Sequence, residues 1–226
     1  MRHLESIILE IDKILKTHSS QPLSVSRKLD RSPVSNIDIQ IDFAIKNSLS
    51  TMYPGIEILS EEDKATRSFS QTGYLGVIDP LDGTENFISK IPIWGVSISV
   101  WLDYTHLESL IYFPELGIKI MSGEVTKILK SEIVGISSSL PVNTTLSEFA
   151  EHDEIRIFGC ATYNLYLVAT GRLKKFINRN GANTWDILAG INIALELGCE
   201  VLIDGKNYSG QFLDGSKKYT VEISRK

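Results

Sequence analysis

The strongest structural signal in this chain is the segment VIDPLDGTENF at residues 77–87. It overlaps the apolar run GYLGVI (73–78), which is typical of a short buried strand. Pro80 has a fixed φ and no N–H, so we expect it to turn the chain sharply out of the sheet and to direct Asp79 and Asp82 to one side. Asp-Gly alone is common in ordinary turns. The segment is informative because its acids follow a strand.

A second acidic segment lies upstream, at the end of another predicted strand. The run IEILS (56–60) is strand-like, and Glu61 and Glu62 follow it. Carboxylates at the ends of neighbouring strands can converge, and Mg²⁺ binds through a few carboxylates, water and a substrate phosphate. The backbone carbonyl of Leu81 is a further candidate ligand. Together the two segments predict a magnesium site.

Gly83 and Thr84 begin a predicted short helix directly after the aspartates. Free N–H groups at a helix start bind phosphate oxygens, so we expect an anion site beside the metal site. Two other acidic motifs do not fit. An EF-hand needs acids at alternate positions before its glycine, where Pro and Leu stand here. Haloacid-dehalogenase-like phosphatases carry DxDGT, whereas two residues separate Asp79 from Asp82, which makes Asp79 a poor phosphorylated nucleophile.

Outward from these segments, helices and strands are interleaved. Apolar residues at helical spacing predict a helix over 4–15, and a second helix begins at a Ser35 or Asn36 cap and ends at the turn 53–55. The remaining predicted elements are strands at 96–102, 110–113, 133–137, 155–158, 173–177 and near the C-terminus, and helices at 163–170 and 184–198. Several strands follow one another without a helix, which favours layered α/β sheets with antiparallel content over a doubly wound fold.

The composition is that of an ordinary globular protein. The 226 residues include 23 Lys+Arg and 28 Asp+Glu, a formal net charge of −5, and 42% are hydrophobic. These proportions exclude a disordered, collagenous or fibrous protein. No linker divides the chain, so we expect a single domain over 1–226 made of two packed halves, at about 1–105 and 106–226. A pI near 5.4 argues against partners such as nucleic acid polymers and anionic membranes.

The cysteine count and the N-terminus both bear on the compartment. Cys160 and Cys199 cannot form a disulfide framework, which favours a reducing compartment. Acidic residues interrupt the apolar pattern of the N-terminal helix, unlike a signal peptide. The uncharged stretch at residues 91–102 is too short to span a bilayer. A cytoplasmic location is therefore expected.

Four segments, in this order, resemble the inositol monophosphatase family: SPVSNID (32–38), ILSEED (58–63), VIDPLDGTENF (77–87) and NTWDILAG (183–190). These are lithium-sensitive, Mg²⁺-dependent phosphatases, and they include bisphosphate nucleotidases of the CysQ type. The similarity covers roughly residues 4–204. It implies a layered αβαβα sandwich and the hydrolysis of a small phosphomonoester, such as a polyol or sugar phosphate, without a phosphoenzyme.

The resemblance also implies a ligand set for two or three Mg²⁺ ions, with one bridging aspartate. Its members by motif position are Glu61, Asp79, the Leu81 carbonyl, Asp82 and Asp186. Two such metals can stabilise the attacking and leaving oxygens of an in-line displacement. Asp38 would pair with Thr84 to orient the attacking water and take its proton, and Glu61 would face a weaker third metal site.

Substrate contacts follow from the resemblance in the segment 156–171, where Gly159, Cys160 and Ala161 lie on the substrate side. From the residues alone, Cys160 is expected to be a buried structural thiol. Arg179 stands where inositol-specific members carry an acid that contacts polyol hydroxyls. Because the guanidinium pairs with phosphate or carboxylate, Arg179 favours a substrate with a second anionic group, or it is a surface residue.

Three interpretations of the function remain. The first is a phosphatase for a polyol or sugar phosphate, and the second is a 3′(2′),5′-bisphosphate nucleotidase of the CysQ type. The third is a catalytically inactive metal- or phosphate-binding protein, against which the presence of every motif acid and of Thr84 argues. Family members are often homodimers, so a homodimer and a small-molecule phosphate ester are the partners that the resemblance implies.

Overall fold

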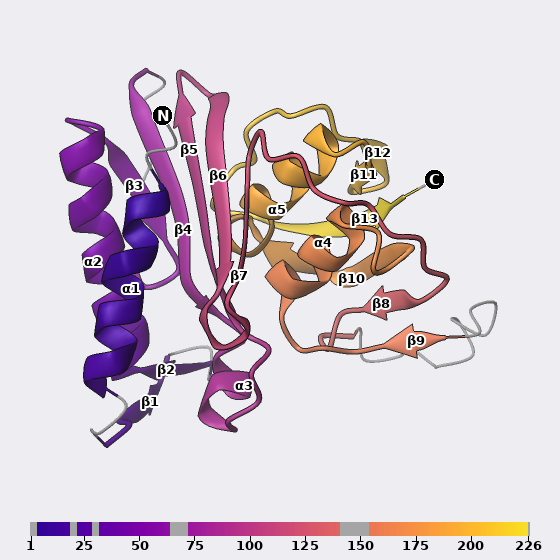
Figure 1. Cartoon of the computed structure of the whole chain (residues 1–226). Helices are drawn as coiled ribbons and strands as arrows, with labels where there is room; N and C mark the ends of the chain where they lie inside the picture. The colour runs from indigo at the N-terminus through magenta and orange to yellow at the C-terminus, as the bar shows by residue number, and fades with distance from the viewer. Residues whose placement is uncertain (1–3, 19–21, 29–31, 64–71, 141–153, 226) are drawn as a thin grey trace.

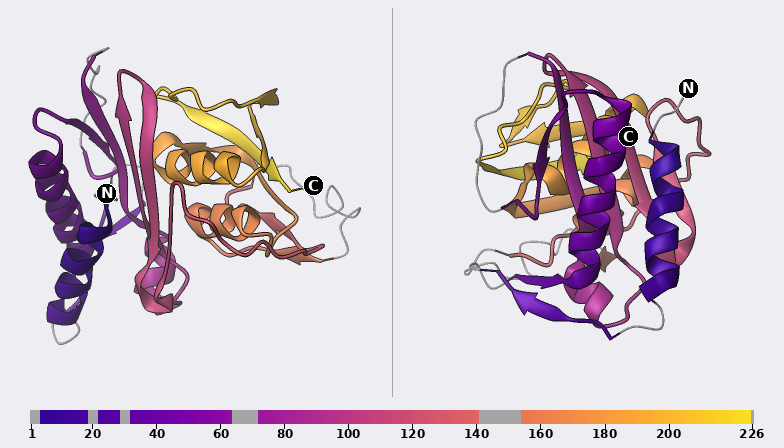
Figure 2. Two further views of the ribbon diagram at one scale, coloured as in Figure 1. Left: turned by 45° about the horizontal axis from the view of Figure 1, so that its top comes forward. Right: turned by 90° about the vertical axis from the view of Figure 1, so that its left-hand side faces the viewer.

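The computed structural model describes residues 4–18, 22–28, 32–63, 72–140 and 154–225. Two β-sheets enclose one pair of helices, and a second pair covers the outer face of the first sheet (Figures 1 and 2). The outer helices are α1 (Glu5–His18) and α2 (Asn36–Met52), and the inner helices are α4 (Ala161–Ala169) and α5 (Thr184–Glu196). The layered α/β sandwich is confirmed, and the described residues form four layers of the αβαβα pattern.

The first sheet has five strands in the order β3-β4-β5-β6-β7. Their bounds are β3 Glu57–Ser60, β4 Tyr74–Asp82, β5 Gly95–Leu102, β6 Thr105–Phe113 and β7 Ile118–Met121. β3 runs parallel to β4, and every other neighbouring pair is antiparallel. The division of the chain into two packed halves near residue 105 stays a prediction. Strands β6 and β7 follow that residue and belong to the first sheet.

The second sheet has six strands in the order β12-β11-β13-β10-β8-β9. Their bounds are β8 Val134–Ile136, β9 Ile155–Arg156, β10 Lys175–Asn183, β11 Glu200–Ile203, β12 Lys206–Asn207 and β13 Lys218–Ser224. The small elements are β1 (Val25–Arg27) and β2 (Pro33–Ser35), which pair antiparallel, the helix α3 (Thr84–Ile88) and the 3₁₀ helix η1 (Pro114–Leu116). Within the described ranges, no helix is both long and apolar enough to cross a membrane.

The two faces of the first sheet carry separate hydrophobic cores. The apolar stripe of α2, made of Ile37, Ile41, Ile45 and Leu49, is buried against the outer face together with residues of α1. The inner face packs on α4 and α5, which in turn meet the second sheet. Burial of such side chains is the main favourable term in folding. The second helix that the sequence predicts is therefore confirmed as α2, and the first sheet is covered on both sides.

The strand β4 continues past the point at which the sequence predicted its end. Pro80 does not turn the chain out of the sheet, because Asp79 pairs with Ser97 and Asp82 with Gly95 on β5. The step from Asp79 to Asp82 is one residue longer than the step it pairs with, so β4 contains a β-bulge. A proline fits a bulge because the bulged residues do not need every ladder N–H.

This bulge decides where the two aspartates point. Residues three apart on a regular strand face opposite sides of the sheet. The extra residue removes that difference, and both Asp79 and Asp82 face the inner helices. Asp82 accepts hydrogen bonds from α4, and Asp79 lies beside Asp186 of α5. The prediction that both aspartates point to one side is therefore confirmed, although its expected cause was wrong.

A C-terminal arginine joins the ends of both inner helices. Arg225 Nη2 donates to the carbonyl oxygens of Ala169 at 2.6 Å and Leu197 at 2.8 Å, and its Nε donates to that of Val168 at 3.3 Å. The last carbonyls of a helix have no partner within the helix, and a cation there also interacts favourably with the helix dipole. Arg225 thus caps α4 and α5 at once.

We expect Arg225→Ala to lower the stability of the fold. Hydrogen bonds to a charged group contribute about 1.5–3 kcal/mol, and a loss of about 2 kcal/mol corresponds to about 4–8 °C in Tm for a chain of this length. The measurement is a thermal unfolding scan beside Arg156→Ala, which removes an exposed arginine whose partners, among the described residues, are Glu154 and Ile155. Equal Tm values for the two variants would contradict the capping role.

Candidate active site

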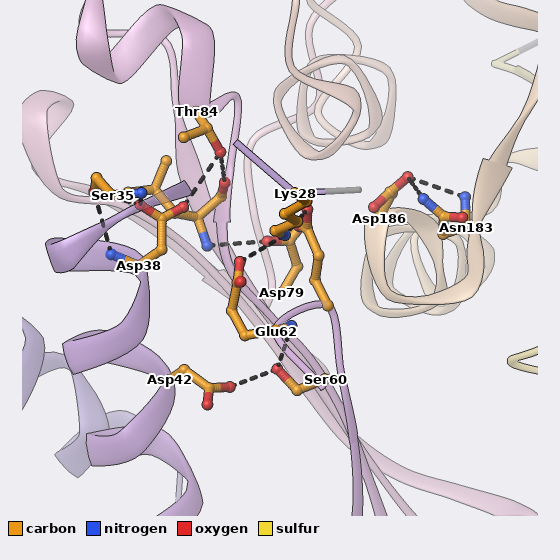
Figure 3. Close-up of polar contacts among 12 residues, drawn as sticks. Lys28, Ser35, Asp38, Asp42, Ser60, Glu62, Asp79, Thr84, Asn183 and Asp186 are labelled. Carbon is orange, nitrogen blue, oxygen red and sulfur yellow. Dashed lines mark hydrogen bonds and ion pairs between the residues drawn. The ribbon is translucent and has the colours of Figure 1, made fainter. Parts of the chain in front are cut away.

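Three carboxylates from three different elements converge at one end of the first sheet. Glu61 follows β3, Asp79 lies at the bulge of β4 and Asp186 lies in the first turn of α5. One carboxylate oxygen from each lies within 4.8 Å of the other two. Figure 3 shows Asp79 and Asp186 facing one another across the space between the sheet and α5. The sequence placed all three in one ligand set, and the structure brings them together.

Asp79 is the most enclosed member of the group, with 1% of its surface exposed. Its Oδ1 accepts a hydrogen bond from the backbone N–H of Leu81 at 2.9 Å, whereas its Oδ2 is buried and has no hydrogen-bond partner among the described residues. Burial, followed by the charges of Glu61, Asp82 and Asp186, raises the pKa of Asp79 well above its ordinary value. A buried, unpartnered carboxylate oxygen beside other carboxylates is what a divalent cation with oxygen ligands would satisfy.

Asp82 faces the start of α4 rather than the centre of the group. Its Oδ2 accepts the backbone N–H of Thr162 at 2.5 Å and the thiol of Cys160 at 3.2 Å. Burial raises the pKa of Asp82, and these hydrogen bonds oppose that rise. Cys160 is buried, as the sequence predicted, but it also fixes the orientation of a site carboxylate. The part that Asp82 plays in metal binding stays a prediction.

Asp38 and Thr84 meet, as the resemblance implied. Thr84 Oγ1 lies 3.3 Å from Asp38 Oδ1 and 3.1 Å from the carbonyl oxygen of Leu81, so its one proton has two acceptors within reach. The other Asp38 oxygen accepts from the N–H of Ser35 at 2.9 Å and from the Ser35 hydroxyl, within a capping box at the start of α2. Burial raises the pKa of Asp38.

Lys28 is a site residue that sequence reasoning missed. Its Nζ lies 2.8 Å from Glu61 Oε1 and 2.9 Å from Glu62 Oε1. Burial lowers the pKa of Lys28, but the two carboxylates outweigh this effect and raise it above its ordinary value. Burial also raises the pKa of Glu62, to about 7, against the opposing effect of Lys28. The only signal was the position of this lysine, just upstream of the SPVSNID segment.

The residues assigned to the substrate side border α3 and α4. Gly83 caps α3 in the left-handed conformation, with φ 93°, and a Cβ there would lie 3.1 Å from the Ile93 carbonyl oxygen and 3.3 Å from Cys160 Cβ. Gly159 also has a positive φ, of 74°, and Ala161 begins α4. Both positions therefore favour glycine. Arg179 is exposed in the irregular part of β10, and its binding role stays a prediction.

The sequence pattern described as the inositol monophosphatase family matches residues 3–222, nearly the whole chain. The chain belongs to this family. The family consists of metal-dependent phosphatases, and its four signature segments here supply the carboxylate group, Asp38 and Thr84. The residues of these segments lie together at one end of the first sheet, and their roles in the reaction stay predictions.

Relatives and solved structures agree with the family assignment. A 3′(2′),5′-bisphosphate nucleotidase CysQ from Shigella flexneri is 28% identical over 211 residues, which cover 84% of both chains. A fructose-1,6-bisphosphatase/inositol-1-monophosphatase from Thermotoga maritima is 28% identical over 211 residues, covering 85% of this chain and 80% of the relative. A solved IMPase/NADP phosphatase complexed with Mg²⁺ and phosphate has a TM-score of 0.82 at 22% identity, covering 98% of this chain and 88% of that one, and shares the fold.

We expect Asp79→Asn to stabilise this protein against unfolding when it is measured in EDTA. Because the pKa of Asp79 is raised on folding, the folded state holds a proton that the unfolded state releases, and stability falls as the pH rises above the ordinary carboxyl pKa. Asparagine keeps the acceptor for Leu81 and removes the charge. In EDTA the variant should gain about 2–4 °C in Tm at pH 8, the shift that about 1 kcal/mol produces, and less at pH 5.

The matched control for this prediction is Asp103→Asn, since Asp103 is exposed and also accepts a backbone N–H, that of Gly73. The control should show the same small change at both pH values. An Asp79→Asn protein that is less stable than the wild type at pH 8 would contradict the electrostatic cost assigned to Asp79.

Proposed function

We propose that this protein is a Mg²⁺-dependent phosphatase that hydrolyses a small-molecule phosphomonoester with an activated water and no phosphoenzyme. The observation that carries the proposal is the unpartnered, buried Asp79 Oδ2 within the carboxylate group, beside the Asp38–Thr84 pair. The residues that would hold two or three Mg²⁺ ions are Glu61, Asp79, the Leu81 carbonyl, Asp82 and Asp186. When bound, Mg²⁺ supplies positive charge to the reacting phosphoryl group and lowers the pKa of a water.

The chain's own residues carry the proton transfer. Thr84 Oγ1 lies where it can accept a hydrogen bond from a water while donating its own proton to Asp38 or to the Leu81 carbonyl. Asp38 is anchored by Ser35 at one oxygen, so its other oxygen is held toward Thr84. Burial raises the pKa of Asp38, which makes it a better proton acceptor than an exposed aspartate. Together the pair orients the water and receives its proton.

A matched pair of variants tests this mechanism. Thr84→Ser keeps the hydroxyl and Thr84→Ala removes it. General acid–base groups contribute about 10²–10⁴-fold, so we expect Thr84→Ala to lower kcat about 100-fold or more, and Thr84→Ser to retain kcat within about fivefold. The substrates are an inositol monophosphate, fructose 1,6-bisphosphate and adenosine 3′,5′-bisphosphate, each assayed with Mg²⁺ and with excess EDTA. Turnover that persists in EDTA, or that is equal in both variants, would refute the proposal.

The substrate class separates two candidates within this chemistry. The position of Arg179 on β10, seven residues before Asp186, favours a substrate with a second anionic group, as in a bisphosphate nucleotidase. The relative from Shigella flexneri, named for that activity, supports the same candidate. A neutral polyol phosphate is the alternative, and it gives Arg179 no partner group on the substrate.

We expect Arg179→Ala to raise KM for adenosine 3′,5′-bisphosphate while leaving kcat nearly unchanged, the signature of lost uniform binding. A charge-assisted contact contributes about 1.5–3 kcal/mol, so kcat/KM should fall about 10- to 100-fold. For an inositol monophosphate the same variant should behave like the wild type. The control is Arg156→Ala, an exposed arginine paired with Glu154. Equal effects on both substrates would exclude Arg179 as the specificity residue.

A further inference from the structure

The turn that carries Glu61 is crowded with negative charge. Glu61, Glu62 and Asp63 are consecutive, and Asp79 lies within the same group as Glu61. Two backbone hydrogen bonds hold the turn: Glu61 N–H donates to the Ile78 carbonyl at 3.2 Å, and Asp63 N–H donates to the Ser60 carbonyl at 3.2 Å. Like charges this close repel one another. A cation beside the turn therefore lowers its electrostatic energy.

Lys28 supplies one cation, but it binds the Glu61 carboxylate itself. The same Glu61 oxygen that Lys28 contacts at 2.8 Å belongs to a side chain of the proposed ligand set. Lys28 thus acts on the proposed ligand itself. An anchor that leaves the Glu61 carboxylate free has to act on the other residues of the turn.

Helix α2 provides such an anchor on its face toward β3. Asp38, Asp42 and Lys46 are four residues apart, so they line one face of the helix. Asp42 Oδ1 accepts from the Ser60 hydroxyl at 2.5 Å (Figure 3). Asp42 Oδ2 pairs with Lys46 Nζ at 2.8 Å. Lys46 Nζ also pairs with Asp63 Oδ1 at 2.8 Å. Helix α2 thus contacts the turn at its first residue, Ser60, and at its last residue, Asp63.

These contacts close into a ring, which we call the α2–β3 clamp: Asp42, Lys46, Ser60 and Asp63. Asp63 Oδ2 accepts the Ser60 N–H at 3.2 Å, and the Ser60 hydroxyl accepts the Glu62 N–H at 3.2 Å. The side chains of Asp42, Lys46 and Asp63 are 11%, 27% and 24% exposed. Such partly buried ion pairs within a network are screened less than surface pairs. None of the four residues belongs to the proposed ligand set.

We propose that Lys46 and Asp42 are positioning residues that hold Glu61 in its metal-binding place through Ser60 and Asp63. The inference rests on the proposed function, because it takes Glu61 to be a metal ligand and assigns to the clamp the task of fixing its position. Residues that orient a ligand from behind typically change metal affinity about 10- to 100-fold when they are removed. The same helix carries Asp38, so the clamp also fixes the spacing between the proton acceptor and Glu61.

The test uses Lys46→Met in the full-length chain, beside Lys46→Arg and the control Lys174→Met. Lys174 is an exposed lysine whose ion pair with Glu132 lies away from the first sheet. Mg²⁺ binding is measured by isothermal titration calorimetry after EDTA treatment, and Mg²⁺ activation is measured with the best substrate. We expect Lys46→Met to raise the Mg²⁺ Kd about tenfold or more, with kcat at saturating Mg²⁺ within about threefold of the wild type. Lys46→Arg should restore the Kd to within about threefold.

Thermal unfolding separates positioning from folding. If Lys46→Met does not fold, Asp63→Asn removes the charge at the other side of the ring and should raise the Mg²⁺ Kd in the same direction. A folded Lys46→Met or Asp63→Asn protein with the wild-type Kd overturns the clamp. A wild type that binds Mg²⁺ but hydrolyses no phosphomonoester refutes the proposed function alone, and the Kd series still decides the clamp.

Discussion

The structure of this site depends on how it holds several buried carboxylates close to Asp79. In four aspartates of this region, one carboxylate oxygen accepts a hydrogen bond from a backbone N–H. The acceptor–donor pairs are Asp38 with Ser35 at 2.9 Å, Asp79 with Leu81 at 2.9 Å, Asp82 with Thr162 at 2.5 Å and Asp186 with Asn183 at 3.0 Å. Hydrogen bonds to a charged acceptor are about twice as strong as neutral ones. Each carboxylate is thereby oriented with one oxygen fixed.

The backbone donors exist because of where the chain changes from one element to the next. Ser35 and Asn183 precede α2 and α5, Thr162 lies in the first turn of α4, and Leu81 lies in the bulge of β4. Helix starts have N–H groups without helical partners, and a bulge frees a strand N–H from its ladder. The site lies at the irregular ends of regular elements because only there are backbone donors available for acids.

Local pattern explains which parts of this arrangement the sequence predicts. The Ser35 cap of α2 and the burial of the apolar stripe of α2 depend on residues within a few positions of one another. The bulge in β4 was missed because Pro80 equally predicts a turn, and the pairing of Asp82 with Gly95 that decides the matter is made by another strand. Lys28 and the β1–β2 pair were missed for the same reason, since Lys28 contacts an acid 33 residues away. Asp42 is salt-bridged to Lys46, and its hydrogen bond with Ser60 joins two elements that are far apart in local pattern.

Two lysines near the same turn have the same charge but different structural effects, because they contact different carboxylates. Lys28 and Lys46 each pair with two carboxylates at distances of 2.8–2.9 Å. Lys28 lies against Glu61, a residue of the proposed ligand set, so its positive charge directly offsets the negative charge of that carboxylate. Lys46 contacts Asp42 and Asp63, which lie outside the proposed ligand set. The positive charge of Lys28 lowers the repulsion within the carboxylate group, whereas Lys46, bound to Asp63 two residues after Glu61, ties the turn to helix α2.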